Sequence, residues 1–365
     1  MNPLLKTLDS LTQPLNLDQS PGLVIRLGDW SAQIQSNSPA LVAELKDYFY
    51  PVLSNHQAWC LQINAIQTDA LDELHALPFE DWQREPGKTG RKEAVFDFED
   101  EQSHPQRLVH KIKTGLVLWQ NAQTPCAFGD LENHPNQVIN FVLNQYLNYC
   151  INQAWLLGHC AGLNLNGRGI AIAGVSGGGK STLMLRLLEQ AQSFISNDRV
   201  LFKCINGENK MRGIPKQPRI NPGTIVHNPK LHALIEDHQP YLAMPSEDLR
   251  ALEQKYDAPV HRLFDEVHYQ VESAIHQFYL LNWQVDTTEP TEIKPVDLSQ
   301  RPDLLKGVMK SPGAFYQNAE QQFQINGQQP DPQPYIEFFK HIECYEICGR
   351  LDFERAQQGI NSKNL

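Results

Sequence analysis

Gly174-Val175-Ser176-Gly177-Gly178-Gly179-Lys180-Ser181 is the stretch that decides the fold, because it fits the pattern G-x-x-x-x-G-K-[ST] at every fixed position. The apolar run 170–173 precedes it and predicts a buried strand. The leucine-rich segment 182–188 follows it and predicts a helix. A strand, a glycine-rich turn and a helix, in this order, are the context that the pattern requires. The stretch therefore predicts a site for a nucleotide or another polyphosphate.

The residue types of this loop have physical reasons. Glycines let successive backbone N–H groups turn toward phosphate oxygens, and the N-terminus of the next helix adds a partial positive charge. We expect Lys180 to neutralise the β- and γ-phosphates of ATP, and the Ser181 hydroxyl to ligate Mg²⁺. A glycine-rich turn without a ligand is the alternative. The residues expected to contact the nucleotide are Gly174, Ser176, Gly177, Gly178, Gly179, Lys180, Ser181 and Thr182.

The composition is that of an acidic globular protein. With 365 residues the chain is long enough for two domains. Hydrophobic residues make up 41% and charged residues 20%, which is typical of globular proteins. The formal net charge of −11 argues against a nucleic-acid partner, whose footprint is a basic surface. No run approaches the roughly 18 consecutive apolar residues of a membrane span, so no membrane partner is expected.

The cysteines and the first residues favour a cytoplasmic location. The seven cysteines are an odd number and follow no framework, which favours free, reduced thiols. Residues 1–16 include Lys6 and Asp9 and lack the sustained apolar segment of a signal peptide.

Two domains are expected along the chain. In residues 1–134, strands at 22–27 and 30–35 and a helix after Ser38 predict a smaller α+β domain. A long helix is expected from Pro135 to about Gly158, and we place the domain boundary before it. Residues 135–365 are expected to form an α/β domain around the glycine-rich loop, with a hairpin over Asn206-Gly207 and a helical C-terminal part. The chain is therefore predicted to be α/β, and α+β overall.

The long helix carries asparagines at intervals of four on one face. This stripe predicts a solvated polar face, with a helix–helix contact as the alternative. Its members are Asn136, Asn140, Asn144, Asn148 and Asn152.

A basic loop at 84–92 stands out in an acidic chain. Lys88, Arg91 and Lys92 lie within it. A solvated hairpin is one interpretation, since runs of charge are usually solvated. A loop that contacts a phosphorylated or acidic substrate is the other.

The region from His159 to Gly213, about 55 residues, resembles the catalytic domain of HPr kinase/phosphorylase, a P-loop fold related to phosphoenolpyruvate carboxykinase. That family has a histidine fifteen residues before the first glycine of the loop, and His159 holds this position. It has an Asp-Asp pair seventeen and eighteen residues after the loop lysine, where this chain has Asn197 and Asp198. It then has a Glu-x-Arg-Gly segment, of which Arg212 and Gly213 are kept. The chain looks most like the HPr-kinase-related proteins.

The departures from the family pattern all remove carboxylates. Thr182, Asn197 and Lys210 stand where the family has glutamate, aspartate and glutamate, and Asp198 alone keeps its charge. A site with fewer acidic groups is expected to hold fewer metal ions, or to hold one more weakly. The reverse activity of the family, a phosphate-driven dephosphorylation, is not expected here.

The resemblance implies an ATP- and Mg²⁺-dependent kinase. The acceptor is a hydroxyl group, on a serine of a small protein or on a small molecule, and a homo-oligomer is implied by resemblance alone. In such a site Asp198 is the candidate to deprotonate the acceptor or to ligate the metal, and His159 to assist proton transfer or to stabilise the phosphoryl group. The candidates to neutralise developing phosphate charge are Arg212, Lys216 and Arg219.

Two other functions remain open. One is a regulator whose output is the binding or hydrolysis of a nucleotide, which needs a mobile element that the γ-phosphate orders. The other is a carboxykinase-like lyase, which needs metal-binding lysine and histidine residues that the N-terminal region does not reveal. A fold does not by itself decide between these functions.

Overall fold

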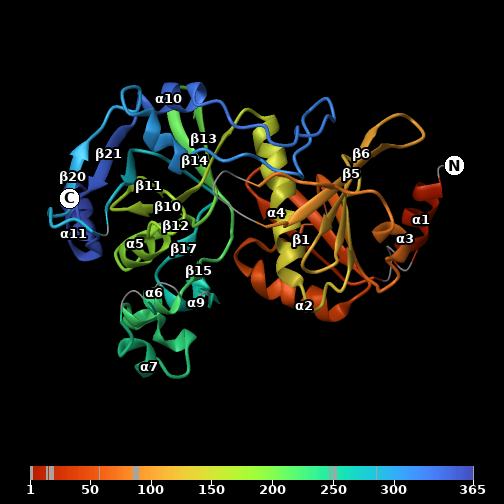
Figure 1. Cartoon of the computed structure of the whole chain (residues 1–365), viewed down its shortest axis with the longest axis horizontal. Coiled ribbons are helices and arrows are strands. Elements are labelled where there is room, and N and C mark those ends of the chain that lie inside the picture. The colour runs from red at the N-terminus through yellow and green to blue at the C-terminus, as the bar shows by residue number, and fades with distance from the viewer. Residues whose placement is uncertain are drawn as a thin grey trace. The chain divides into compact units, whose positions relative to one another are not determined.

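The computed structural model describes residues 3–13, 15, 20–56, 58–84, 90–245, 248–249, 252, 254–284 and 286–364. The chain forms two compact units (Figure 1). The first comprises Met1–Ala154 and Ser311–Gln329, and the second comprises Trp155–Lys310 and Pro330–Leu365. The boundary expected at residue 134 thus falls at Ala154, because the long helix packs within the first unit. A segment of the C-terminal part also returns to that unit.

The described residues of the first unit form an eight-stranded mixed sheet in the order β1-β2-β3-β8-β7-β6-β5-β4. β3 runs parallel to both of its neighbours, and the other pairs are antiparallel. The strands are β1 (Gly22–Leu27), β2 (Trp30–Ser36), β3 (Leu61–Gln67), β4 (Glu80–Asp81), β5 (Glu93–Glu99), β6 (Pro105–Lys111), β7 (Val117–Gln120) and β8 (Cys126–Gly129).

Helices cover both faces of this sheet (Figure 1). Leu8 of one helix and Leu74 of another pack into a core with Phe128 of β8. On the other face, Tyr146 lies against Trp30 of β2 with ring centroids 5.4 Å apart. The helices are α1 (Pro3–Thr12) and α3 (Asp72–His75) on the first face, and α2 (Pro39–Tyr48) and α4 (Pro135–Asn152) on the second, with the 3-10 turn η1 (Tyr50–Val52) after α2.

The returning segment 311–329 is held by a buried arginine of β6. Arg107 is 4% exposed. Its Nη1 donates to the carbonyl oxygens of Ala314 at 3.2 Å and Gln324 at 3.3 Å, and its Nε donates to Asp97 at 2.6 Å. The hydrogen bonds to Ala314 and Gln324 join residues about two hundred positions apart in the chain.

The asparagines of α4 complete this attachment. Nδ2 of Asn148 donates to the carbonyl oxygen of Phe315 at 2.7 Å, and Nδ2 of Asn152 donates to that of Gln317 at 3.1 Å. Asn148 is 9% exposed and faces the segment 311–329 instead of solvent, whereas Asn136 and Asn152 are exposed, as the predicted solvated face requires. Asn140, by contrast, bonds a carbonyl of its own helix. None of the helices in the described ranges is long and apolar enough to cross a membrane.

The second unit contains three sheets in its described residues: β17-β12-β10-β11-β19-β21-β20, β18-β14-β13-β9 and β15-β16. The strands of the first are β10 (Cys160–Leu165), β11 (Arg168–Gly174), β12 (Ala191–Ser196), β17 (His268–Tyr269), β19 (Gln277–Leu281), β20 (Glu292–Pro295) and β21 (Glu343–Cys348). Those of the others are β9 (Leu156–Gly158), β13 (Val200–Ile205), β14 (Glu208–Gly213), β18 (Glu272–Ala274), β15 (Arg219–Ile220) and β16 (Tyr256–Asp257).

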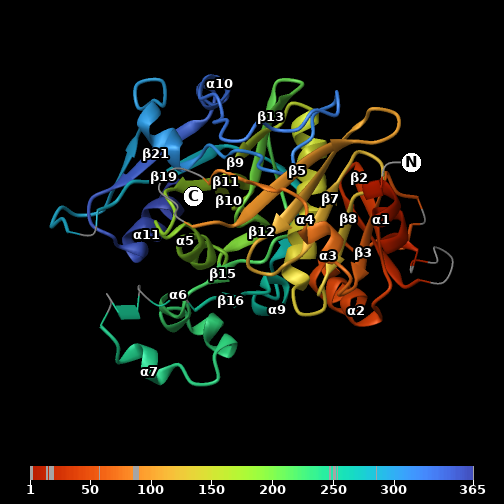
Figure 2. The same ribbon diagram turned by 45° about the vertical axis from the view of Figure 1, so that its right-hand side comes forward.

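The helices of this unit are mostly short. Figure 2 shows α6 and α7 beside β15 and β16, away from the seven-stranded sheet. The helices are α5 (Lys180–Leu187), α6 (Pro222–Val226), α7 (Gln239–Leu242), α9 (Val260–Leu263), α10 (Gln333–Phe339) and α11 (Phe353–Lys363), with the 3-10 turns η2 (Pro229–Leu234) and η3 (Pro302–Gly307).

β11 is buried on both faces, which explains its apolar sequence. Ile170 and Ile172 pack into the core with α5 and α11. Ala171 and Ala173 pack into a second core, with Phe202 of the four-stranded sheet and with α10. β11 is parallel to β19, and strands of such sheets read as continuous apolar runs because helices or sheets cover both sides.

Two predictions about element type are wrong. The long helix ends at Asn152, because Ala154 has a φ of 61° and leaves the helical region; residues 156–158 form β9, which pairs with β13. The C-terminal part is not only helical, because β20 and β21 join the seven-stranded sheet. β21 is parallel to β19 and buries Ile347 in the core.

Candidate functional site

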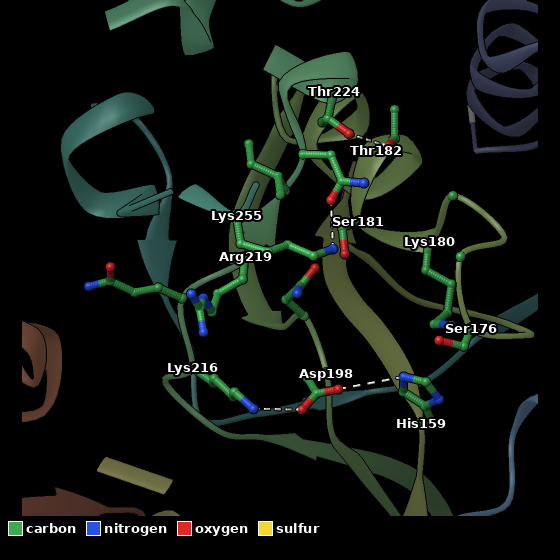
Figure 3. Close-up of a pocket in the computed structure, with 16 residues that line it drawn as sticks. His159, Ser176, Lys180, Ser181, Thr182, Asp198, Lys216, Arg219, Thr224 and Lys255 are labelled. Atoms are coloured by element: carbon green, nitrogen blue, oxygen red, sulfur yellow. Dashed lines mark hydrogen bonds and ion pairs between the residues drawn. The ribbon is translucent and has the colours of Figure 1, made fainter. Parts of the chain in front are cut away.

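The topology of the seven-stranded sheet brings three segments to one edge. β10 lies between β11 and β12 and is antiparallel to both, so the carboxyl ends of β11 and β12 lie beside the amino end of β10. The glycine-rich loop (residues 174–181) leaves β11, Asn197 and Asp198 follow β12, and His159 precedes β10. The three segments line one cavity of about 330 Å³ (Figure 3). Ligands of open α/β sheets bind at such carboxyl ends.

Two aromatic rings hold the glycine-rich loop. Gly177 and Gly179 have φ values of 80° and 87°, which favour glycine. A Cβ on Gly179 would lie 2.7 Å from the ring of Phe353, whereas a Cβ on Gly177 would meet nothing within 4 Å. The indole Nε1 of Trp283 donates to the carbonyl oxygen of Gly178 at 2.9 Å. The rings of Trp283 and Phe353 meet edge to face, with centroids 5.0 Å apart.

Lys180 lies folded along this loop. Its Nζ donates to the carbonyl oxygens of Gly174 at 2.7 Å and Val175 at 3.1 Å, and the residue is 7% exposed. Gly174 and Gly178 therefore support the loop through their carbonyl groups. The residues of the predicted phosphate-binding set that line the cavity are Ser176, Gly177, Gly179, Lys180, Ser181 and Thr182.

Asp198 lies among cations. Its Oδ2 accepts a hydrogen bond from Nζ of Lys216 at 2.9 Å, its Oδ1 accepts one from Nη1 of Arg199 at 2.8 Å, and Nε2 of His159 lies 3.5 Å from Oδ1 (Figure 3). Burial raises the pKa of the Asp198 carboxyl, but Arg199 and Lys216 outweigh it and hold this pKa well below its usual value. A general base works best with a pKa near the working pH. Asp198 is therefore better suited to hold a cation than to take a proton.

Asn197 lines the same cavity and carries a buried side-chain oxygen. The residue is 8% exposed, and among the described residues its Oδ1 has no hydrogen-bond partner. Buried polar atoms are paired in the large majority of cases. A ligand that donates a hydrogen bond reaches this oxygen only if the Asn197 side chain turns toward the cavity.

The wall opposite the glycine-rich loop is rich in cations. Lys216 and Arg219 come from the proline-rich segment 214–224, and Lys255 comes from the residues before β16. Nε of Arg219 lies 3.2 Å from Oδ1 of Asp257, and both side chains are about half exposed. Nζ of Lys255 donates to Oδ1 of Asn221 at 2.6 Å. The wall is therefore locally positive in a chain of net charge −11.

The oxygen donors of the cavity fit a magnesium ion that arrives with a nucleotide. Ser181 and Asp198 line the cavity and carry a hydroxyl and a carboxylate, respectively. Within the described ranges, no group of three or more His, Cys, Asp or Glu side chains is arranged to hold a metal. Mg²⁺ usually keeps several waters and binds one or two carboxylates together with substrate phosphates. The donor set suits that mode of binding and not a cage built by the protein alone.

Arg212 does not line the cavity with the other predicted residues. It lies on β14, where its Nε donates to Oε2 of Glu272 on β18 at 2.6 Å. Its guanidinium carbon lies 4.5 Å from the ring centroid of Trp155. Glu272 lies sixty residues away from Arg212 in the sequence. The match of Arg212 to the family pattern therefore did not indicate that it lies outside the cavity.

The basic loop belongs to the first unit. Nη2 of Arg91 lies 2.6 Å from Oδ1 of Asp81, and Nζ of Lys92 lies 3.8 Å from Oε1 of Glu93. Lys88 lies outside the described residues. Arg91 and Lys92 thus have acidic neighbours within their own unit.

Several residues of the cavity were missed by the sequence analysis. Lys255 is an isolated lysine in no motif, and only the β15–β16 pairing brings it beside the segment 214–224. Thr224 is placed by its hydroxyl, which lies 2.8 Å from that of Thr182 at the start of α5. The other missed residues are Gln217, Ile220 and Asn221.

Comparisons with known proteins give a distant likeness among solved structures. No protein-family model matches the chain, and no curated protein matches it. Among solved structures, the HPr(Ser) kinase/phosphatase from Coxiella burnetii is similar to 56% of this chain and 86% of that chain, with 13% sequence identity and a TM-score of 0.28. The likeness to that protein is distant and concerns the fold of a mixed α/β chain with several sheets.

Proposed function

We propose that this protein is an ATP-dependent phosphotransferase, which moves the γ-phosphoryl group of Mg·ATP to a hydroxyl acceptor. One observation carries the proposal: the glycine-rich loop with Lys180 and the charged cluster around Asp198 face the same cavity. The loop has the residue types that cradle phosphates. The cluster follows the carboxyl end of β12, which runs in the same direction as β11 with β10 between them, and phosphoryl transfer needs positioned charge at such a place.

The residues divide into roles. Lys180 leaves the loop carbonyls and binds the β- and γ-phosphates, and the backbone N–H groups of the loop surround them. Ser181 and Asp198 would hold a magnesium ion, whose charge would offset that of the phosphates. Lys216 stabilises charge on the transferring phosphoryl group, and His159 fixes the Asp198 carboxylate. Since the transition state of phosphoryl transfer is loose, positioning and charge contribute more than a strong base, which suits the low pKa of Asp198.

A nucleotide-binding regulator is the second candidate, and one observation favours it. The carboxylate in the position of a base is bound by Lys216 and Arg199, so it is a weak base for activating an acceptor hydroxyl. In such a regulator, binding or hydrolysis of ATP is the output, and no label reaches an acceptor.

The test is to incubate the purified protein with γ-labelled ATP, Mg²⁺ and a lysate of its own cell, and to follow the label. We expect label on an acceptor with the wild type and not with Lys180→Ala. Lys340→Ala is the matched control, because Lys340 pairs with Glu337 on α10 and lies outside the cavity lining. Label that stays on ATP, or goes only to inorganic phosphate, contradicts the transferase and supports the regulator.

A further inference from the structure

We infer that the acceptor is a small anionic molecule, which carries a phosphate or carboxylate group beside the hydroxyl that receives the phosphoryl group. The inference rests on the proposed function and adds its substrate class. It follows from three features of the cavity: its charge, one unpaired oxygen and its size.

The net positive charge of the cavity is larger than the negative charge of a bound magnesium–nucleotide complex. Among the described residues, the charged residues of the lining and their direct ion-pair partners comprise five cations and two carboxylates. The magnesium complex of a nucleoside triphosphate retains about two negative charges, since the metal neutralises part of the phosphate charge. One positive charge then remains, and it is poorly screened inside a cavity. The cations are Lys180, Arg199, Lys216, Arg219 and Lys255, and the carboxylates are Asp198 and Asp257.

Lys255 is the cation best placed to bind the anionic group. Lys216 is bound by Asp198, and Arg219 lies near Asp257. Among the described residues, Nζ of Lys255 donates a hydrogen bond to the neutral amide oxygen of Asn221. An anion that approaches this ammonium gains a charge-assisted hydrogen bond and displaces no carboxylate.

Asn197 supplies the place for the acceptor hydroxyl. Asn197 lies in the cavity wall and precedes Asp198 in the chain, and its buried Oδ1 has no hydrogen-bond partner among the described residues; it meets a ligand only if the side chain turns toward the cavity. A hydroxyl group that donates to this oxygen would satisfy it, and a buried acceptor left without a partner is costly. An amide also carries no charge, so it does not repel an anion as an aspartate in this position would.

The size and lining of the cavity agree with a small molecule. Its volume of about 330 Å³ lies at the low end of the range of roughly 300–1,000 Å³ for small-molecule sites. The uncharged side chains of its wall are mostly polar, among them Gln217, Asn221 and Thr224, which suits hydroxyl and phosphate groups. A serine in a protein needs room for the backbone on either side of it.

The first test uses inorganic phosphate as the probe. The full chain is saturated with Mg²⁺ and a non-hydrolysable ATP analogue, and phosphate is then titrated by calorimetry. We expect phosphate to bind the wild type and Lys340→Met alike, and Lys255→Met to bind it more weakly by tenfold or more, the worth of one hydrogen bond to a charged group. Absence of phosphate binding, or equal affinity in Lys255→Met, overturns the inference. If the ATP analogue itself does not bind, the proposed function fails instead.

The second test separates the two kinds of acceptor. After labelling in the lysate, a filter divides proteins from small molecules, and the small-molecule fraction is run on an anion exchanger. We expect the labelled small molecules to elute later than a sugar monophosphate, whose phosphate is its single anionic group. Label on a protein serine, or on a product without a second anionic group, overturns the inference while leaving the phosphotransferase proposal intact.

Discussion

Replacing Asp198 by asparagine removes the carboxylate that Arg199 and Lys216 both bind. A hydrogen bond to a charged group contributes about 1.5–3 kcal/mol. The three side chains are 20–25% exposed, so solvent screens part of this, and an amide oxygen keeps one acceptor. We therefore expect Asp198→Asn to lower the free energy of unfolding by about 2 kcal/mol. At roughly 2–4 °C per kcal/mol for a unit of this size, the melting temperature should fall by about 4–8 °C.

The control is Asp303→Asn. Asp303 pairs with Arg301 at 2.9 Å, but their side chains are 57% and 39% exposed, and an exposed pair contributes less than about 1 kcal/mol. Both variants are measured by thermal and denaturant unfolding. If Asp198→Asn destabilises the protein no more than Asp303→Asn does, the charged cluster is not formed as described.

The pH dependence gives an independent check. The pKa of Asp198 is lowered in the folded protein, so its contribution is complete above the unfolded value of about 3.9 and is lost as the pH falls below it. The difference in stability between wild type and Asp198→Asn should be constant from pH 7 to pH 5 and shrink only in stronger acid. A difference that disappears near pH 6 would mean that another group carries it.

The same variant distinguishes the two roles of Asp198 in transfer. Because its low pKa makes it a weak base, we expect Mg²⁺-dependent ATP binding to weaken together with transfer, and extra Mg²⁺ to restore both in part. If Asp198 were instead the base, transfer would fall by roughly 10²–10⁴ while Mg·ATP affinity stayed nearly intact.

Two further predictions follow from single contacts. Gly179→Ala should abolish ATP binding and lower the free energy of unfolding by roughly 1–3 kcal/mol, because the new Cβ meets the ring of Phe353. Gly177→Ala has open space around its Cβ and should lower the free energy of unfolding by only about 1 kcal/mol, through backbone strain. Calorimetry and thermal unfolding compare the two variants, and equal effects would refute the contact with the ring. Asn148→Leu should remove the hydrogen bond to the carbonyl of Phe315, lower the free energy of unfolding by about 1–3 kcal/mol and speed hydrogen exchange in residues 311–329. Asn140→Leu, the control, should not speed this exchange. Unchanged exchange in Asn148→Leu would contradict the attachment of the segment to α4.

The parts of the fold that the sequence predicted well are those set by neighbouring residues. The glycine-rich loop lies between β11 and α5, and Asn206-Gly207 turns between β13 and β14, because turn geometry depends on local residue type. Asp198 was predicted from the spacing of the family pattern, and the strand order β12-β10-β11 brings it to the same cavity as the loop. Its bonds to Lys216 and Arg199, which decide its basicity, could not be predicted from spacing.

The parts that escaped prediction depend on contacts between distant residues. The segment 311–329 is polar and lacks periodicity, and its attachment depends on Arg107 and Asn148, far away in the chain. Lys255 reaches the cavity through a two-residue strand pair. Arg212 pairs with Glu272 and does not line the cavity. Side-chain partners of this kind are a property of tertiary structure, and no local pattern encodes them.

Calorimetry of Mg·ATP binding to the wild type and to Lys180→Ala tests the central claim most directly. Circular dichroism first establishes that the variant is folded, since Lys180 also bonds the carbonyl groups of Gly174 and Val175. The wild type should bind Mg·ATP, and the folded variant should lose at least tenfold in affinity, because the lysine neutralises phosphate charge. Equal affinity in the two proteins, or no binding by the wild type, would contradict a nucleotide site in the glycine-rich loop.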